Sequence, residues 1–116
     1  MDLYQGWFDL KPGVSDVEVS DRLASYMERL QQDGQIAGWR LMRRKLGLGP
    51  ADLGEFHLII ELEDLAQLDR AFHNVSTRSD PTESLHHALN SQIANVRFAL
   101  YRDFPDAHRQ RGQEKF

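Results

Sequence analysis

The chain has 116 residues, of which 41% are hydrophobic and 28% charged, so its length and composition are those of one globular domain. It contains no cysteine, which excludes disulfides, thiolate metal sites and thiol nucleophiles and fits a cytoplasmic location. The net charge of −4 argues against nucleic acid or an anionic membrane surface as a partner, and we expect neither a signal peptide nor a membrane span.

The first part of the chain predicts a strand followed by a helix. Residues 2–9 are rich in aromatic side chains and end before Lys11-Pro12-Gly13, which is typical of a strand that stops at a turn. Ser15 and Glu18 have the spacing of a capping box, and Gly34 is a typical left-handed helix stop. Between these signals, one apolar stripe recurs every three or four positions and predicts a buried helix face: Val19, Leu23, Met27 and Leu30.

The remainder predicts a hairpin, a helix in two pieces and a last strand. Two strands, over residues 37–46 and 55–63, are joined by a loop rich in glycine and proline. Asp64 is placed to cap a helix with one apolar face, made of Leu65, Leu68, Phe72 and Val75. Asp80-Pro81 begins a second short helix that carries Leu85, Ala88 and Leu89. Residues 93–101 form the last predicted strand.

This order of elements predicts an α+β fold. Two βαβ crossovers around a central hairpin make a ferredoxin-like βαββαβ sandwich, with an antiparallel sheet and both helices on one face. We expect this domain to cover residues 1–103 and a polar C-terminal tail to cover residues 104–116. The other face of the sheet is then left without cover from its own chain.

Side chains alternate across each strand, so the uncovered face can be read from the sequence. Apolar sets in the third and last strands, Phe56/Leu58/Ile60/Leu62 and Val96/Phe98/Leu100, predict the face under the helices. The opposite face mixes polar and apolar groups: Arg40, Met42, Arg44, His57, Ile59, Glu61, Arg97 and Tyr101. In the first strand, either Tyr4, Gly6 and Phe8 or Leu3, Gln5 and Trp7 could join it. Such a face suits either a half-polar homodimer interface or the wall of a ligand cavity.

The pattern resembles the dimeric α/β-barrel superfamily, on the element order and on the last strand Val96-Arg97-Phe98-Ala99-Leu100-Tyr101. The segments Leu3-Tyr4-Gln5-Gly6-Trp7-Phe8-Asp9-Leu10 and Gly38-Trp39-Arg40-Leu41 are also similar to those of a small bacterial family of uncharacterised proteins. The resemblance implies two sheets that meet face to face, with ligands inside or beside the barrel. Members include monooxygenases, haem-degrading enzymes and lactone isomerases, so the fold does not fix the activity.

The candidate ligand-binding residues are His57, Arg40, Arg44, Arg97 and Tyr101. His57 could act as a general base beside carboxylates, or it could be a hydrogen-bonded structural residue. The arginines could bind an anion, or they could lie on an exposed hairpin paired with acids. His86 and His87 sit beside Glu83 and Asn90, yet adjacent histidines on a helix diverge by about 100°, so we predict no metal site and no cofactor.

The sequence therefore predicts a homodimer, paired through its open sheet face, that binds a small organic ligand in the barrel or an adjacent cleft. An anion is one candidate for this ligand. One alternative is a cofactor-independent monooxygenase or isomerase of the same superfamily. A second alternative is a structural dimer without catalytic activity, in which ion pairs between subunits seal the mixed face.

Overall fold

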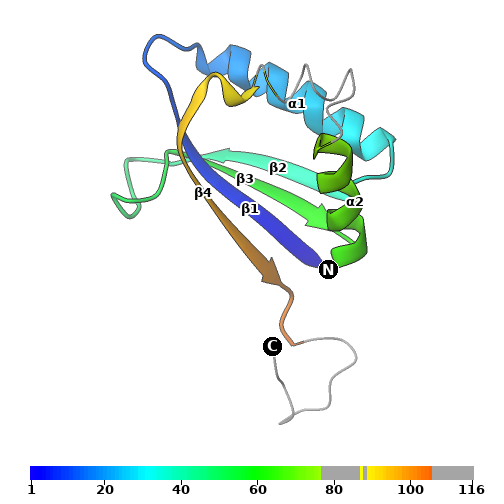
Figure 1. The fold of residues 1–116 in the computed structure, drawn as a ribbon. Helices are drawn as coiled ribbons and strands as arrows, with labels where there is room; N and C mark the ends of the chain where they lie inside the picture. The colour runs from blue at the N-terminus through cyan, green and yellow to red at the C-terminus, as the bar shows by residue number, and fades with distance from the viewer. Residues whose placement is uncertain (77–86, 88, 106–116) are drawn as a thin grey trace.

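A computed structural model describes residues 1–76, 87 and 89–105 of the chain. The elements follow in the order β1 (Asp2–Leu10), α1 (Asp16–Gln32), β2 (Gly38–Arg43), β3 (Phe56–Leu62), α2 (Leu65–Ser76) and β4 (Ile93–Arg102). The strands form one antiparallel sheet in the order β2-β3-β1-β4 (Figure 1). This confirms the ferredoxin-like βαββαβ prediction.

The two ends of α1 are set by local hydrogen bonds that its sequence specifies. The Ser15 hydroxyl accepts a hydrogen bond from the Glu18 backbone N–H, which satisfies one amide that the first turn leaves without a partner. At the other end, Gly34 takes a left-handed φ of 72° and donates its N–H to the Gln31 carbonyl. The predicted apolar stripe is buried along the whole helix, together with Tyr26.

A buried glutamine, which the sequence pattern does not single out, fastens α2. Gln67 Oε1 accepts from the Glu63 N–H at 2.8 Å, and Gln67 Nε2 donates to the Gly34 carbonyl at 3.1 Å. These bonds tie the first turn of α2 to the end of β3 and to the turn after α1. Leu65, placed by its spacing on the apolar face, is more than half exposed instead.

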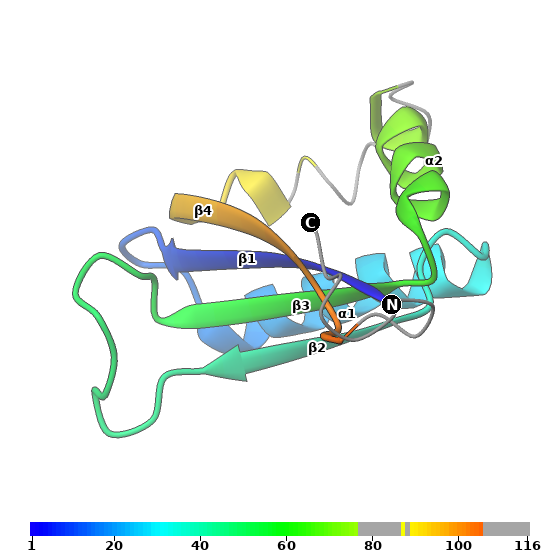
Figure 2. The ribbon, with the colours of Figure 1, turned by 90° about the horizontal axis from the view of Figure 1, so that it is seen from below.

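The strand pairing settles which set of β1 residues faces which side. Tyr4, Gly6 and Phe8 lie on the side of the helices, because they pair with helix-side residues of β3 and β4. Leu3, Gln5 and Trp7 lie on the opposite side, which we call the open face. Figure 2 looks onto the sheet from this side, with α1 behind the strands.

The core lies between α1 and the sheet, and β4 contributes less to it than its sequence predicts. Phe8, Phe56 and Leu62 from the strands pack with the buried stripe of α1. Val96, Phe98 and Leu100 do lie on the helix side of β4, yet Phe98 and Leu100 are at least half exposed. The reason is position, because β4 is an edge strand beyond the reach of α1.

Several predictions fall outside the part of the chain that the structure describes. The short helix that begins at Asp80-Pro81 lies there, except for His87, Leu89 and Asn90, and so does the tail from residue 106 onward. The boundary at residues 103 and 104 therefore stays a prediction. Neither described helix has the length and the apolar composition that crossing a membrane requires.

Candidate functional site

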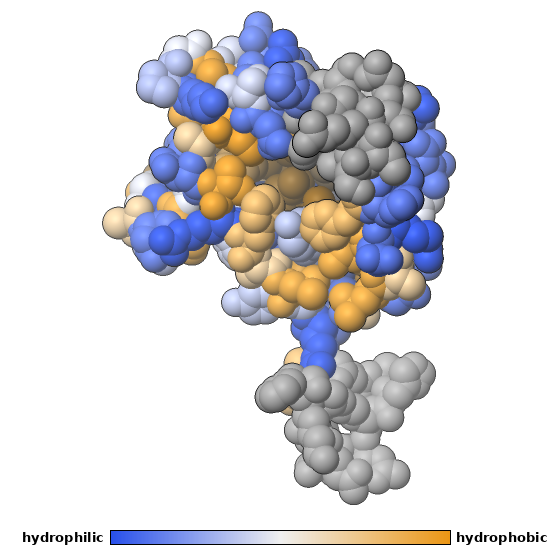
Figure 3. All heavy atoms as spheres, in the orientation of Figure 1, coloured by the Kyte–Doolittle hydropathy of each residue, from blue (hydrophilic) through white to orange (hydrophobic). Residues whose placement is uncertain are grey.

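An apolar cavity of about 190 Å³ lies between the helices and the sheet. α1 contributes Leu23, Tyr26, Met27 and Leu30, and α2 contributes Leu68, Ala71 and Phe72, while all strands except β2 form the floor. Figure 3 shows hydrophobic residues gathered around a hollow on this side of the molecule. Among the described residues, α1 and α2 leave part of the helix-side face of β1 and β4 open to this cavity.

Three aromatic rings stand together at the β4 side of this cavity. The ring of Tyr4 stacks on that of Phe98, with centroids 5.4 Å apart, and meets Phe72 edge to face at 5.4 Å. Gly6 makes this arrangement possible, because a Cβ at that position would lie 3.3 Å from the Phe98 ring. Phe98 and Phe72 remain about half exposed or more, so this trio also borders solvent.

The polar side chains among the described cavity-lining residues are few: Tyr4, Tyr26 and Asn90. Burial raises the pKa of the Tyr4 hydroxyl above its ordinary value of 10.0, because a phenolate would lose hydration there. Tyr4 therefore stays protonated at neutral pH. Its hydroxyl is suited to donate a hydrogen bond rather than to accept a proton.

On the open face, His57 belongs to a compact cluster with Trp7 and Gln5. The His57 ring stacks on the Trp7 indole with centroids 4.3 Å apart, and His57 Nε2–H donates to Gln5 Oε1 at 2.8 Å. Gln5 is only 9% exposed even within one chain. Burial lowers the pKa of His57 below its ordinary value of 6.5, so the neutral ring is favoured.

The strand register arranges the open face in three rows across the sheet. The first row holds Met42, His57, Trp7 and Arg97, the second Arg40, Ile59, Gln5 and Ala99, and the third Gly38, Glu61, Leu3 and Tyr101. His57 and Arg97 thus share a row, and Arg40 lies in the next one. Tyr101 is four residues along β4 from Arg97, which is about 13 Å in a strand.

Two of the predicted arginines are already engaged. Arg97 Nη1 lies 3.4 Å from Asp52 Oδ2, in an ion pair that joins β4 to the loop between β2 and β3. Arg44 follows β2, and its Nη2 donates to the carbonyl oxygens of Pro50 and Leu53 at 2.8 and 2.7 Å. Arg44 therefore organises that loop and is not gathered with His57.

Of the predicted histidine pair, His87 is described and exposed, while His86 and Glu83 lie outside the described residues. Within the described ranges, His, Asp and Glu side chains form no group of three that could hold a metal ion.

The sequence placed His57 on the open face, as the structure does, but it did not identify the partners of His57 or the cavity on the other side of the sheet. Trp7 and Gln5 were one of two options for the first strand, and only pairing with β3 selects them. The cavity depends on how far each helix reaches over the sheet, which strand periodicity does not contain. The one available signal was Gly6 within an aromatic strand, because a strand glycine often marks a close approach of another group.

With this geometry established, comparison with known proteins places the chain. The model of the family described as "Family of unknown function (DUF6614)" matches residues 1–116. The chain belongs to this family. A comparison of this DUF6614 member with curated proteins found no match.

Solved structures similar to this DUF6614 chain share its fold. SnoaB, a cofactor-independent oxygenase from Streptomyces nogalater, is 11% identical, with a TM-score of 0.69 over 93% of this chain and 97% of its own. A DABB family protein with a ferredoxin-like fold from Mesorhizobium loti is 15% identical, with a TM-score of 0.61 over 88% and 95%. A dimeric protein of unknown function from Bacteroides fragilis is 14% identical, with a TM-score of 0.54 over 88% and 95%.

Proposed function

We propose that this protein is a homodimer that binds a small, uncharged, ring-containing organic molecule in the cavity between its helices and its sheet. The observation that carries the proposal is the apolar cavity with its few polar side chains, which is the usual character of a small-molecule site. Without bound ligand, such a cavity leaves its lining short of packing contacts, so a molecule that fills it stabilises the fold.

The volume and the lining narrow the class of ligand. A cavity of about 190 Å³ is somewhat larger than the roughly 150 Å³ engineered cavity that takes up benzene. One aromatic ring with substituents, or two small fused rings, would fill it. A charged group is disfavoured because its hydration would be lost, and the described lining residues offer no counter-charge. The predicted arginines lie on the other side of the sheet, so this site favours neutral over anionic ligands.

Pairing through the open face is supported by its chemistry. Trp7, Met42 and Ile59 leave an amphiphilic surface on the side that neither α1 nor α2 covers, and such surfaces are commonly buried in a partner. The similar structure from Bacteroides fragilis is described as dimeric. The same face contains His57 and Gln5, so we assign these residues to the interface rather than to catalysis.

The test is to fill the cavity and measure binding. Ala71 lines the cavity, whereas Ala66 on the same helix is exposed. We expect the wild-type protein to bind 1-naphthol saturably, with one molecule per chain, as followed by naphthol fluorescence and by a rise in melting temperature. Ala71→Phe should weaken this binding by about tenfold or more, because the new ring takes the ligand's place.

Ala66→Phe is the matched control, because it makes the same change on the same helix away from the cavity. It should bind 1-naphthol as the wild type does. The proposal is wrong if a panel of one- and two-ring neutral compounds gives no saturable binding, or if both variants bind equally. The first of these outcomes would favour a structural dimer.

We propose oxygenation of the bound molecule as a second candidate function, on the strength of Tyr4. A protonated hydroxyl at the edge of an apolar cavity can stabilise an oxygen anion on a substrate, which cofactor-independent oxygenation requires. SnoaB, described as such an oxygenase, has the same fold. With isotopically labelled O2, the wild type should convert 1,4-dihydroxynaphthalene and O2 to labelled 2-hydroxy-1,4-naphthoquinone and water faster than the reaction without protein, and Tyr4→Phe should do so more slowly. Equal rates with and without protein would eliminate this candidate.

A further inference from the structure

The loop between β2 and β3, residues 44–55, projects past one end of the sheet (Figures 1 and 2). Two leucines of this loop are exposed to solvent. Leu46 is 84% and Leu48 77% exposed. Isolated exposed leucines are ordinary, but these two stand within three residues at the tip of one loop. In a loop with a fixed conformation, two such leucines form an apolar surface that a partner can bury.

Several contacts do hold the loop in one shape. The two hydrogen bonds from Arg44 to the Pro50 and Leu53 carbonyls cross it from side to side. Gly49 allows this crossing, because a Cβ there would lie 2.7 Å from Arg44 Nε. Leu46 has a φ of 57°, a left-handed conformation that is unfavourable for a leucine and persists only where the surroundings impose it. The leucines are thus displayed by a preorganised loop.

The loop is also continuous with the open face. Asp52 of the loop pairs with Arg97, which belongs to the first row of that face. The Gly54 turn packs tightly on β1, because a Cβ there would lie 2.5 Å from the Phe8 backbone. A partner that covers the first row of the open face therefore meets the loop as well.

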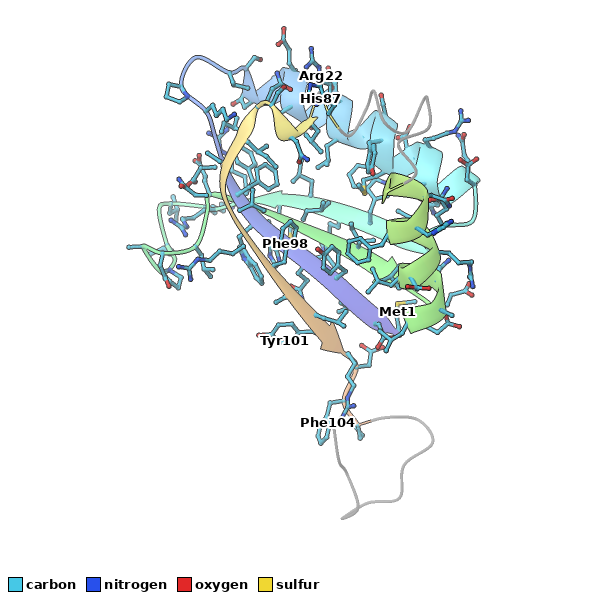
Figure 4. All side chains as sticks on the ribbon, viewed as in Figure 1. Met1, Arg22, His87, Phe98, Tyr101 and Phe104 are labelled. Carbon is cyan, nitrogen blue, oxygen red and sulfur yellow. The ribbon has the colours of Figure 1, made fainter. Side chains whose placement is uncertain are left out.

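A second exposed apolar group stands at the opposite end of the same face. Tyr101 in the third row is 60% exposed, and Phe104, just beyond β4, is 73% exposed. Figure 4 shows Tyr101 and Phe98 on opposite sides of β4 and Phe104 on the extension past the strand. The described chain thus has an apolar projection at each end of its open face.

We propose that the β2–β3 loop of one copy of this chain grips the end of β4 of a second copy, with Leu46 and Leu48 against Tyr101 and Phe104. This inference rests on the proposed homodimer and specifies how it is built. A two-fold axis that crosses the open face perpendicular to the strands brings each end of one sheet over the opposite end of the other. The β2–β3 loop of each copy then meets the end of β4 of the other copy, so the same contact forms twice in the dimer, as a two-fold symmetric interface requires.

Charge favours this axis over one that runs along the strands. With the perpendicular axis, Lys45 of the loop approaches Asp103 of the second copy, and the His57 row lies over the row that holds Glu61. With the other axis, each end of one sheet lies over the same end of the other, so Lys45 stays at the end of the sheet away from Asp103 of the second copy. The perpendicular axis also brings Arg40 toward its own copy, but Arg40 is exposed on the edge strand, where water screens that repulsion.

Disulfide trapping tests the contact directly, because the chain contains no cysteine of its own. Leu48 and Phe104 lie at opposite ends of the sheet, so the variant Leu48→Cys/Phe104→Cys cannot close a bond within one chain. Mild oxidation should convert most of it to a covalent dimer. Leu48→Cys alone should give little. Val17→Cys/Phe104→Cys is the matched control, because Val17 is an exposed apolar residue on the helix side, and it should also give little.

A second measurement keeps the test independent of cysteine chemistry. Leu46→Ser/Leu48→Ser should raise the dimer dissociation constant by about tenfold or more, whereas Val17→Ser should not. A dimeric wild type without the 48–104 bond, or with a preferred 48–48 bond, would overturn this inference and leave the dimer standing. A monomeric wild type would overturn the proposed dimer itself.

Discussion

At the scale of single residues, His57 gives the open face a group that can change its charge near neutral pH. Its pKa lies below 6.5 because burial beside Trp7 disfavours the charged ring. The folded chain therefore binds fewer protons here than the unfolded chain does. The free energy of unfolding is highest above about pH 7.5 and falls as the pH drops through 6.5 toward the folded pKa.

Urea unfolding at several pH values checks this prediction. His57→Gln should flatten the dependence between about pH 7.5 and 5.5, because glutamine does not titrate. If His57→Gln keeps the wild-type slope, groups other than His57 cause the pH dependence of the free energy of unfolding.

Gly49 is the second residue whose replacement has a definite expected effect. Gly49→Ala places a Cβ against the Arg44 guanidinium, so the two hydrogen bonds of that group to the loop are weakened. We expect a loss of about 1–2 kcal/mol in the free energy of unfolding, measured by urea denaturation. In an Arg44→Ala background the same glycine change should have little effect. Additive losses would contradict the contact.

At the scale of elements, the attachment of α2 depends on Gln67. Gln67→Ala removes the hydrogen bonds to Glu63 and Gly34 and leaves their backbone groups without this partner. The free energy of unfolding should fall by about 1–3 kcal/mol in urea denaturation. Gln32→Ala, at an exposed position at the end of α1, should change it by less than about 0.5 kcal/mol. Equal effects would show that Gln67 does not fasten the helix.

Local chemistry explains which elements the sequence predicts well. The Ser15 cap, the Gly34 stop and the stripe of α1 are encoded within a few residues, and the structure confirms all three. The exposure of Phe98 was not predictable from periodicity, because it depends on the edge position of β4. The role of Gln67 was missed for a similar reason, since its partners include Gly34, which is distant in sequence.

The candidate sites were predictable to different degrees for the same reason. Alternation within β3 places His57 on the open face without further information, whereas its contacts with Trp7 and Gln5 require the register between β1 and β3. Alternation does not predict the position of the Arg44 side chain. Arg44 lies just beyond the end of β2, and its hydrogen bonds to the loop between β2 and β3 determine where the side chain lies. The cavity could not be predicted from any single element, because it depends on how α1, α2 and the sheet are placed relative to one another.

At the scale of the whole molecule, the proposed dimer predicts a mass of twice 13.4 kDa in light scattering at micromolar concentration. Trp7→Asp puts a charge into the first row of the open face, so it should shift the protein to the monomer. Val17→Asp makes a similar change on the exposed surface of α1 and should leave the dimer intact. A monomeric wild type would contradict the assembly, and a dimeric Trp7→Asp would place it on another surface.

The sheet of this protein separates the apolar cavity from the open face. Along β1, Tyr4, Gly6 and Phe8 border the cavity, while the residues between them border the open face. Alternate residues of β1 therefore belong to different surfaces, and a substitution on one face leaves the side chains on the other face unchanged. Under the proposed function, related chains can therefore differ in the ligand that they bind while they keep the same dimer interface.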